Sequence, residues 1–298
     1  MLFYHESWDI MLIKDHGTHL FPDNTLEILN KSAAQQLKKK YTFQADPFLI
    51  EKDDKLYVFY EAFSFRNSKG TLRCRILDRE LTEIDDVKLE GFDDLRCHLS
   101  FPFLININNQ LFMIPESSER KEVLLFQSVE FPARWKKIKV LLSDTEVTDN
   151  IFLSINETCY LLSTTMDNKI IIHSAEHLHG QWQRITPTLK VSNHHHRGAG
   201  TPYLVDNKMY FLTQECTPET YGKSIYIKEL VTPSTIPLEE YEKIKNDHNI
   251  MISLYDDDKA ETSHSALLKE IKDFKQMKVS SLLLNYLKLT QKREIDYI

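Results

Sequence analysis

Glycine is scarce in this chain, which has only seven among its 298 residues. A dinucleotide-binding or P-loop site needs several glycines at fixed spacing, because the backbone must approach the phosphate groups closely. The sequence contains no such glycine-rich loop. We therefore expect no nicotinamide, no nucleotide-fold cofactor site and no other cofactor.

Cysteine is also rare, and positive charge is not in excess. Cys74, Cys97, Cys159 and Cys216 lie singly inside apolar runs, without the paired spacing of a zinc site. We interpret them as buried thiols of a protein in a reducing compartment. The formal net charge of −7 gives no support for a nucleic-acid-binding surface.

Long hydrophobic runs are missing as well. The first nine residues have neither a basic region nor a sustained apolar stretch, so we expect no secretory signal and no transmembrane span. The hydrophobic fraction of 42% is nevertheless that of a folded protein. Together these features predict a cytoplasmic protein, with peripheral contact at a membrane as an open alternative.

What the sequence does contain is a repeat with a period of roughly fifty residues. Four segments share an apolar pattern, and most of them have a polar residue near the start. Each segment is followed by a short polar turn and a second apolar run. The segments are 45–50, 100–105, 148–153 and 200–205. Asn, Asp and Lys in the turns suit short hairpin loops. Repetition at this period is typical of a β-propeller or another repeat architecture.

The predicted fold is all-β: a five-bladed β-propeller over residues 1–264, with a helical C-terminal extension over 265–298. Short runs, flanking turns and repetition favour three or four antiparallel strands per unit. The four clear repeats lie near 45–78, 100–142, 148–190 and 200–232.

A fifth blade would be assembled from both ends of the propeller, by the strand 9–14 and a segment near 251–255. Such closure would remove free sheet edges, and four blades with an irregular cap is the alternative. Residues 22–40 indicate a short helix or an excursion between blades. The extension 265–298 is expected to pack on the propeller or to make a basic amphipathic contact with a membrane or partner.

In a propeller the innermost strands line a central channel, so matching positions in the repeats converge on one pocket. Asp46 and Asp149 occupy the same place in the first and third repeats, where the second and fourth have Phe101 and Thr201. Acidic residues in an apolar strand are costly to bury without partners, which suggests a polar channel.

Carboxylates around one cavity are what glycosidic chemistry requires. One must stay protonated to assist the leaving oxygen, and another must stay ionised as base or nucleophile. We assign Asp46 as base or nucleophile, Glu116 as general acid and Asp149 as the orienting or pKa-setting carboxylate. Glu61 is the reserve candidate. The alternative for each is a structural role in holding blades together through backbone hydrogen bonds.

Further residues are expected at the same mouth as substrate-binding groups. Arg197 precedes a small-residue turn, and its planar guanidinium suits a phosphate or a carboxylate. His98 is placed to donate to a sugar hydroxyl. Gln214 holds the position in the fourth repeat that corresponds to Glu61 and Glu116, and His264 is a weaker candidate. We expect no metal at the three histidines 194–196, because adjacent side chains on a strand point alternately to opposite faces.

These motifs occur in an order that resembles a known family. The quoted pieces are Ala45-Asp46-Pro47-Phe48, Phe59-Tyr60-Glu61, His98-Leu99-Ser100-Phe101-Pro102, Met113-Ile114-Pro115-Glu116-Ser117, Phe131-Pro132 with Trp135, Gly180 with Trp182, Arg197-Gly198-Ala199-Gly200 and Tyr221-Gly222. Over about residues 8–265 the series resembles the N-terminal domain of plant glucosamine inositolphosphorylceramide transferases and its stand-alone bacterial relatives. More distantly, the Asp-Pro entry is similar to that of five-bladed arabinanase-, xylosidase- and invertase-like enzymes.

The resemblance implies a five-bladed propeller tied to glycoconjugate metabolism. It does not settle the reaction, because in the plant proteins a separate C-terminal domain looks like the transferase. Thr201 and Phe211 stand where the resemblance leads us to expect arginines.

Three functions remain open at this point. The first is an enzyme acting at a glycosidic bond, most simply a glycosyltransferase in cell-surface glycan biosynthesis, with a glycoside hydrolase or phosphorylase as the alternative. Its partners would be a sugar donor, nucleotide- or phosphate-activated, and a glycan acceptor. The second is a non-catalytic glycan-binding module, since propellers host many functions. The third is an adaptor that acts through the C-terminal helix.

Overall fold

The computed structural model describes residues 8–13, 34–66, 68–155, 158–185, 197–205, 208–216, 221–231 and 253–255. Within these ranges the chain forms β-strands and one short 3-10 helix, η1 (Ser118–Arg120). No helix in this described part is long and apolar enough to cross a membrane. The predicted all-β class is confirmed, whereas the predicted helical extension 265–298 lies outside the described residues.

Four antiparallel sheets of four or five strands follow one another along the chain. The first contains β3 (Phe43–Lys52), β4 (Lys55–Ser64), β5 (Lys69–Leu77) and β6 (Glu83–Lys88). The second contains β7 (Ser100–Ile107), β8 (Gln110–Glu116), β9 (Val123–Glu130) and β10 (Arg134–Leu142). The third contains β11 (Val147–Ile155), β12 (Thr158–Thr165), β13 (Ile170–Ala175) and β14 (Gln183–Ile185). In the fourth, β15 (Arg197–Gly198) and β16 (Tyr203–Val205) both pair with β17 (Lys208–Cys216), followed by β18 (Tyr221–Val231) and β19 (Ser253–Tyr255).

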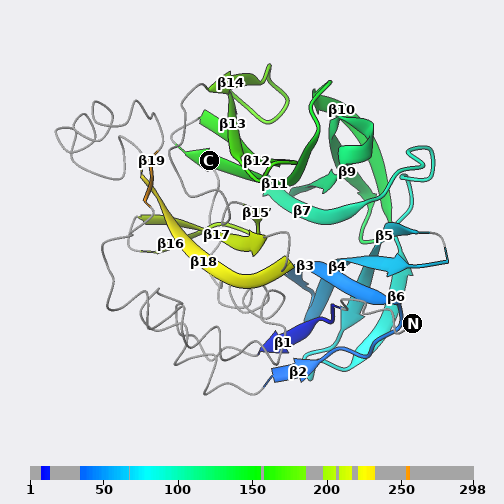
Figure 1. Cartoon of the computed structure of the whole chain (residues 1–298). Helices are drawn as coiled ribbons and strands as arrows, with labels where there is room; N and C mark the ends of the chain where they lie inside the picture. Colours follow the sequence, from blue (N-terminus) through cyan, green and yellow to red (C-terminus); the bar gives the residue numbers. More distant parts are fainter. Residues whose placement is uncertain are drawn as a thin grey trace, which may run out of the picture.

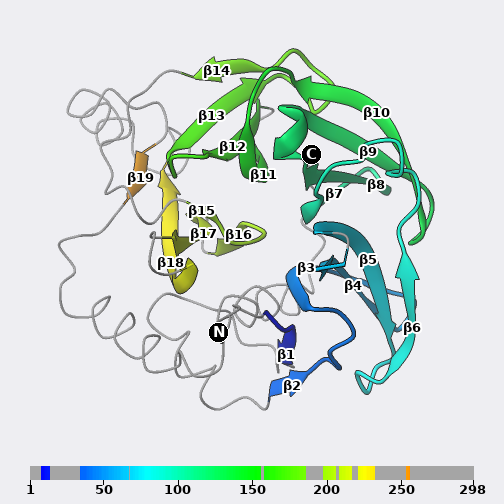
Figure 2. The ribbon, with the colours of Figure 1, turned by 45° about the vertical axis from the view of Figure 1, so that its right-hand side comes forward.

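The four sheets are arranged as blades around a common centre (Figures 1 and 2). In each blade the first strand in sequence (β3, β7, β11 and β15) lies innermost. Strand β3 contacts β7, β7 contacts β11, and β11 contacts β15. The repeats therefore bring their matching positions to one central region, as the sequence predicts. The count of five blades stays a prediction.

The two segments expected to build a fifth blade pair with different strands in the described residues, and the fifth blade stays a prediction. The strand β1 (Met11–Ile13) pairs with β2 (Ala34–Gln36) in a separate two-stranded sheet. The segment near 251–255 contains β19, which pairs with the long strand β18 at the outer edge of the fourth blade. The segment 22–40 was predicted as a short helix or an excursion between blades; its residues 34–36 form strand β2, while 22–33 lies outside the described residues.

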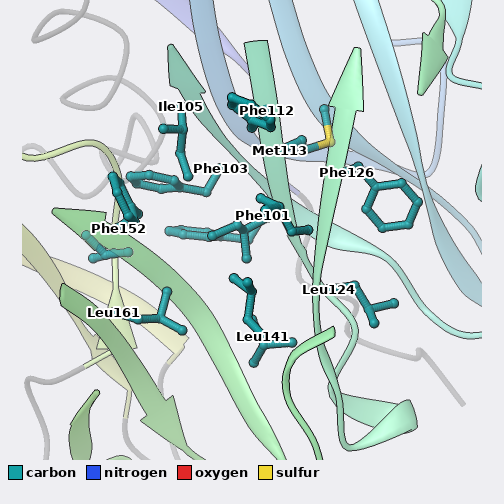
Figure 3. Packing of buried hydrophobic residues seen from close by; sticks show 14 of the residues in the cluster. Phe101, Phe103, Ile105, Phe112, Met113, Leu124, Phe126, Leu141, Phe152 and Leu161 are labelled. Carbon is teal, nitrogen blue, oxygen red and sulfur yellow. The ribbon is translucent and has the colours of Figure 1, made fainter. Parts of the chain in front are cut away.

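Strand β4 shows how blades stack, because its side chains alternate between two cores. Tyr57 and Phe59 pack toward the second blade, in the large core that Figure 3 shows in part. Val58 and Tyr60 face the opposite way, in a smaller core with Ile10 and Leu12 of the N-terminal segment. A strand that is buried on both faces reads as a continuous apolar run, which is how it appears in the sequence.

A bulge recurs in the innermost strand of the first three blades. Asp46, Phe101 and Asp149 have positive φ values of 51°, 42° and 48°, and the strand register shifts at each of these points. Asp tolerates this left-handed conformation well, whereas a bulky residue such as Phe rarely adopts it. Because a bulge redirects side chains and often stands beside active sites, this repeated geometry aims the two aspartates toward the centre.

The two-stranded sheet β1–β2 provides a test of blade stacking. Leu12 is fully buried against the first blade, so Leu12→Ala should lower the free energy of unfolding by about 2–4 kcal/mol in a denaturant titration. Ile84→Ala, at a side chain that is 53% exposed, should change it by less than about 0.5 kcal/mol. Equal, small losses for both variants would show that the N-terminal sheet is not part of the folded core.

Candidate active site

The guanidinium of Arg197 lies among carboxylates that come from different blades. Its Nε is 2.5 Å from Oδ2 of Asp149, and its Nη2 is 3.6 Å from Oε2 of Glu116. The backbone N–H of Asp149 also donates to Oε2 of Glu116, at 3.4 Å. One arginine of the fourth blade thus connects an acid of the third blade with an acid of the second.

Arg197 was expected before a turn, near a donor phosphate. It begins the innermost strand β15, where its backbone pairs with Gln214, another predicted site residue. The Nε2 of Gln214 donates to the carbonyl oxygen of Gly198 at 3.3 Å, so this amide supports the inner strand of the fourth blade.

Asp46 is the least buried of the four acidic residues as a whole, although protein surrounds its carboxyl group. Its Oδ2 accepts a hydrogen bond of 3.3 Å from the backbone N–H of Phe101. Burial and the charge of Asp149 raise the pKa of Asp46 to about 7, against the opposing effect of Arg197. Asp46 can therefore exist in either protonation state near neutral pH.

Glu61 is enclosed and has an imidazole beside it in place of a guanidinium. The Nε2 of His98 lies 3.2 Å from Oε1 of Glu61, and Nδ1 of His98 accepts a hydrogen bond of 3.0 Å from the backbone N–H of Gly70. An accepting Nδ1 carries no proton, so the proton of the neutral ring is on Nε2, facing Glu61. Burial lowers the pKa of His98, which keeps the ring neutral.

Two glycines make room for these carboxylates. A Cβ added to Gly70 would lie 2.3 Å from Oε1 of Glu61, and one added to Gly198 would lie 2.9 Å from Cβ of Asp149. Each glycine is therefore required by the close approach of an acidic side chain to a neighbouring backbone.

The cluster holds more negative than positive charge. Four carboxyl groups (Asp46, Glu61, Glu116 and Asp149) surround the single guanidinium, and burial is the first cause that raises the pKa of every one of them. The pKa of Asp149 rises to about 7 although Arg197 opposes the shift, and that of Glu61 rises well above its ordinary value. Four buried negative charges in one cluster would repel one another strongly, so the site retains protons near neutral pH.

Local hydroxyl groups hold two of the acids in place. The hydroxyl of Ser118 donates to Oε1 of Glu116 at 3.2 Å, and that of Thr148 donates to Oδ2 of Asp149 at 3.4 Å. Neither hydroxyl was predicted, but each stands within two positions of a predicted acid. Such neighbours of a candidate acid are the signal that could have found them.

Of the ten residues weighed for this centre, the structure brings together Asp46, Glu61, His98, Glu116, Asp149, Arg197 and Gln214. Phe101 contributes a backbone N–H, and Thr201 follows the inner strand of the fourth blade. His264 and the histidines 194–196 lie outside the described residues. Within the described ranges, no three His, Cys, Asp or Glu side chains are placed so as to hold a metal ion.

Comparison with known proteins supports the ordered set of motifs. The sequence model of the family described as glucosamine inositolphosphorylceramide transferase 1, N-terminal, matches residues 21–281. The chain belongs to this family. It is 28% identical over 246 residues to glucosamine inositolphosphorylceramide transferase 1 of Arabidopsis thaliana and 26% identical over 216 residues to that of Oryza sativa subsp. japonica.

The matched region is only part of these relatives. It covers 79% of this chain but 31% of the Arabidopsis protein, and 68% of this chain but 28% of the rice protein. The chain thus spans less than a third of the length of the curated relatives it matches.

Solved structures share the fold at low sequence identity. One is exo-β-1,3-galactanase of Phanerochaete chrysosporium, with a TM-score of 0.52 and 13% identity over 64% of this chain and 47% of that chain. Another is the catalytic domain of an α-L-arabinofuranosidase of Coprinopsis cinerea, with a TM-score of 0.50 and 11% identity over 65% of each chain. At this identity the likeness establishes the fold alone.

The raised pKa values predict how stability depends on pH. A carboxyl group whose pKa is higher in the folded than in the unfolded state stabilises the fold at low pH and loses this contribution as pH rises. For Asp46 the loss falls between about pH 4 and pH 7. Asp46→Asn removes this titration. The free energy of unfolding of the variant, relative to that of the wild type, should therefore be about 1–3 kcal/mol higher at pH 8 than at pH 5. Denaturant titrations at both pH values measure this difference, and the exposed Asp94→Asn is the matched control.

Arg197→Met tests the charge balance by removing the positive charge of the cluster. Removing the guanidinium leaves buried carboxylates without compensation, which should cost about 3–5 kcal/mol of stability at pH 8. At pH 5 the acids hold more protons, and the loss should be clearly smaller. A loss of the same size at both pH values would contradict the view that the arginine offsets negative charge.

Proposed function

We propose that this domain acts at a glycosidic bond during the biosynthesis of a surface glycan or glycolipid, as a glycosyltransferase. The observation that carries the proposal is the central group of four buried carboxyl side chains beside one guanidinium, in which the pKa of every carboxyl group is raised. Glycosyl transfer and hydrolysis both need one acid that gives a proton and one that stays ionised. Membership of the family supports the biosynthetic direction.

Asp46 is proposed as the base or nucleophile. Its pKa of about 7 lets it take up a proton from an acceptor hydroxyl or a water near neutral pH. Asp149 is proposed as the carboxylate that sets this pKa, because its charge acts directly on Asp46 while Arg197 holds it in place.

Glu61 now ranks ahead of Glu116 as the proposed general acid. Glu116 lies beside Arg197 and accepts hydrogen bonds from Ser118 and the Asp149 backbone, contacts that favour its charged form. Glu61 lies beside the neutral His98, and burial together with the charges of Asp46 and Glu116 raises its pKa well above the ordinary value, so it keeps a proton more readily. A general acid must begin the reaction protonated.

The charge of the cluster also bears on the substrate. A phosphate at Arg197 would have to compete with Asp149 and Glu116 for the guanidinium, amid an excess of acidic groups. This supports a neutral sugar ring at the carboxylates, with the phosphate of an activated donor placed away from them. Hydrolysis is the second candidate, because the same base can take a proton from water in place of an acceptor hydroxyl.

Turnover assays with the purified chain test the proposal. Sugar nucleotides with glycan acceptors, and aryl glycosides alone, would separate transfer from hydrolysis by the product formed. Asp46→Asn and Glu61→Gln should each lower kcat/KM by about 10²–10⁴-fold, because each removes a proton-transfer or nucleophilic group. Asp94→Asn should leave it unchanged.

Full activity in both carboxyl variants would overturn the residue assignment. Sugar binding without turnover on either set of substrates would overturn the enzymatic proposal and favour a glycan-binding module. If Glu116→Gln were inactive and Glu61→Gln active, Glu116 would be the acid.

A further inference from the structure

Three aromatic rings continue outward from the carboxylates along the edge of the first blade. Phe63 stacks on Phe43 across the strand pair β3–β4, with ring centroids 4.4 Å apart and an interplanar angle of 5°. Phe65 meets the same ring edge-on, with centroids 5.4 Å apart. Phe63 is therefore fixed between two neighbours, in arrangements that aromatic pairs prefer.

The alternation of a β-strand places this aromatic group beside Glu61. Residues two apart on a strand share a face, so Glu61 and Phe63 of β4 point to the same side. His98 joins them, since its ring centroid is 6.1 Å from that of Phe63 and its Nε2 is 3.2 Å from Glu61 Oε1. Gly70, directly across from Phe63, leaves the space that Glu61 and His98 occupy.

Exposure rises steadily along this line. Glu61 is buried, Phe63 is partly buried, and Phe65 is 49% exposed. The imidazole of His98 is 27% exposed. The four groups form a continuous path from the protein surface to a proposed catalytic acid.

The chemistry of this path indicates its ligand. Aromatic rings bind the apolar face of a pyranose, while polar groups at the edge bind its hydroxyls, a combination typical of specific ligand sites. Polar groups flank the rings here: Lys69 lies 3.7 Å from Glu119, and the hydroxyl of Thr42 accepts a bond from the N–H of Phe65.

A lipid surface would need a wider apolar area than this edge offers. Five large apolar side chains are exposed among the described residues: Phe65, Ile84, Val129, Val140 and Met166. Only Phe65 is linked by ring contacts to the carboxylate site. One exposed ring falls well short of the few hundred Å² of a typical apolar interaction patch.

We propose that Phe63 and Phe65, together with the edge of His98, form a binding subsite for a neutral pyranose ring of the acceptor glycan. This inference rests on the proposed function, because it is the path to Glu61 that makes the bound ring an acceptor. Neither the acidic groups nor the family match assigns a role to these phenylalanines.

Binding of simple glycosides by saturation-transfer NMR tests the subsite without requiring turnover. The probes are the methyl pyranosides of glucose, galactose, mannose and N-acetylglucosamine, added to the full chain carrying Asp46→Asn. At least one should receive saturation on the protons of a single ring face. Phe65→Ala should weaken its binding about three- to tenfold, the loss expected for one aromatic contact.

Phe65→Trp should retain binding, and Val129→Ala, at another exposed apolar side chain, is the matched control. Thermal unfolding of each variant shows that the fold is intact. Equal pyranoside affinity in Phe65→Ala and in the parent, or no binding of any pyranoside, would overturn the proposal. So would loss of binding to dispersed short-chain phosphocholine in Phe65→Ala with pyranoside binding unchanged, which would assign the ring to lipid.

The design separates this inference from the proposed function. Pyranoside binding that depends on Phe65, in a chain whose wild type shows no turnover, would uphold the subsite and reject the enzyme. Turnover in the wild type, with no effect of Phe65→Ala on pyranoside affinity or KM, would uphold the enzyme and reject the subsite.

Discussion

The contact of one arginine with acids from two other blades is the interaction on which the site depends. Arg197 reaches from the fourth blade to Asp149 of the third and Glu116 of the second. A buried carboxylate without a cation or hydrogen-bond donors would be strongly unfavourable, so this guanidinium allows several acids to be enclosed at the centre. It does not neutralise them all. The remaining excess of negative charge keeps protons in the site, and a site that keeps protons near neutral pH is suited to acid–base chemistry.

Backbone geometry supplies the second constraint. The left-handed residues Asp46, Phe101 and Asp149 occur at the same register shift in three successive blades. In the first and third blades the bulge carries an acid, while in the second it carries a phenylalanine whose N–H binds Asp46. One repeated distortion therefore provides two carboxylates and a donor that orients one of them. The fold and the site are built from the same feature of the repeat.

Much of the fold and of the candidate site could be predicted from the sequence, because matching positions of a repeat occupy equivalent places in successive blades. The apolar runs predicted the inner strands, and the positions of Asp46, Glu61, Glu116 and Asp149 in the repeat predicted their convergence. The partner of Arg197 could not be predicted in this way, since a guanidinium suits a phosphate as well as a carboxylate. Nor could the pairing of β1 with β2 and of β19 with β18, because edge strands pair with whichever partner the tertiary fold brings near. The backbone conformation of Phe101 was equally hidden, since nothing in its residue type favours a positive φ.

The cluster holds protons near neutral pH because it encloses more carboxylates than cations. The most direct measurement is a carbon-13 NMR titration of the side-chain carboxyl groups in the labelled protein, with Asp46→Asn used to assign the Asp46 signal. We expect Asp46 to titrate at a pKa of about 7. Titration of Asp46 near pKa 4, the ordinary value for an aspartate in water, would contradict it.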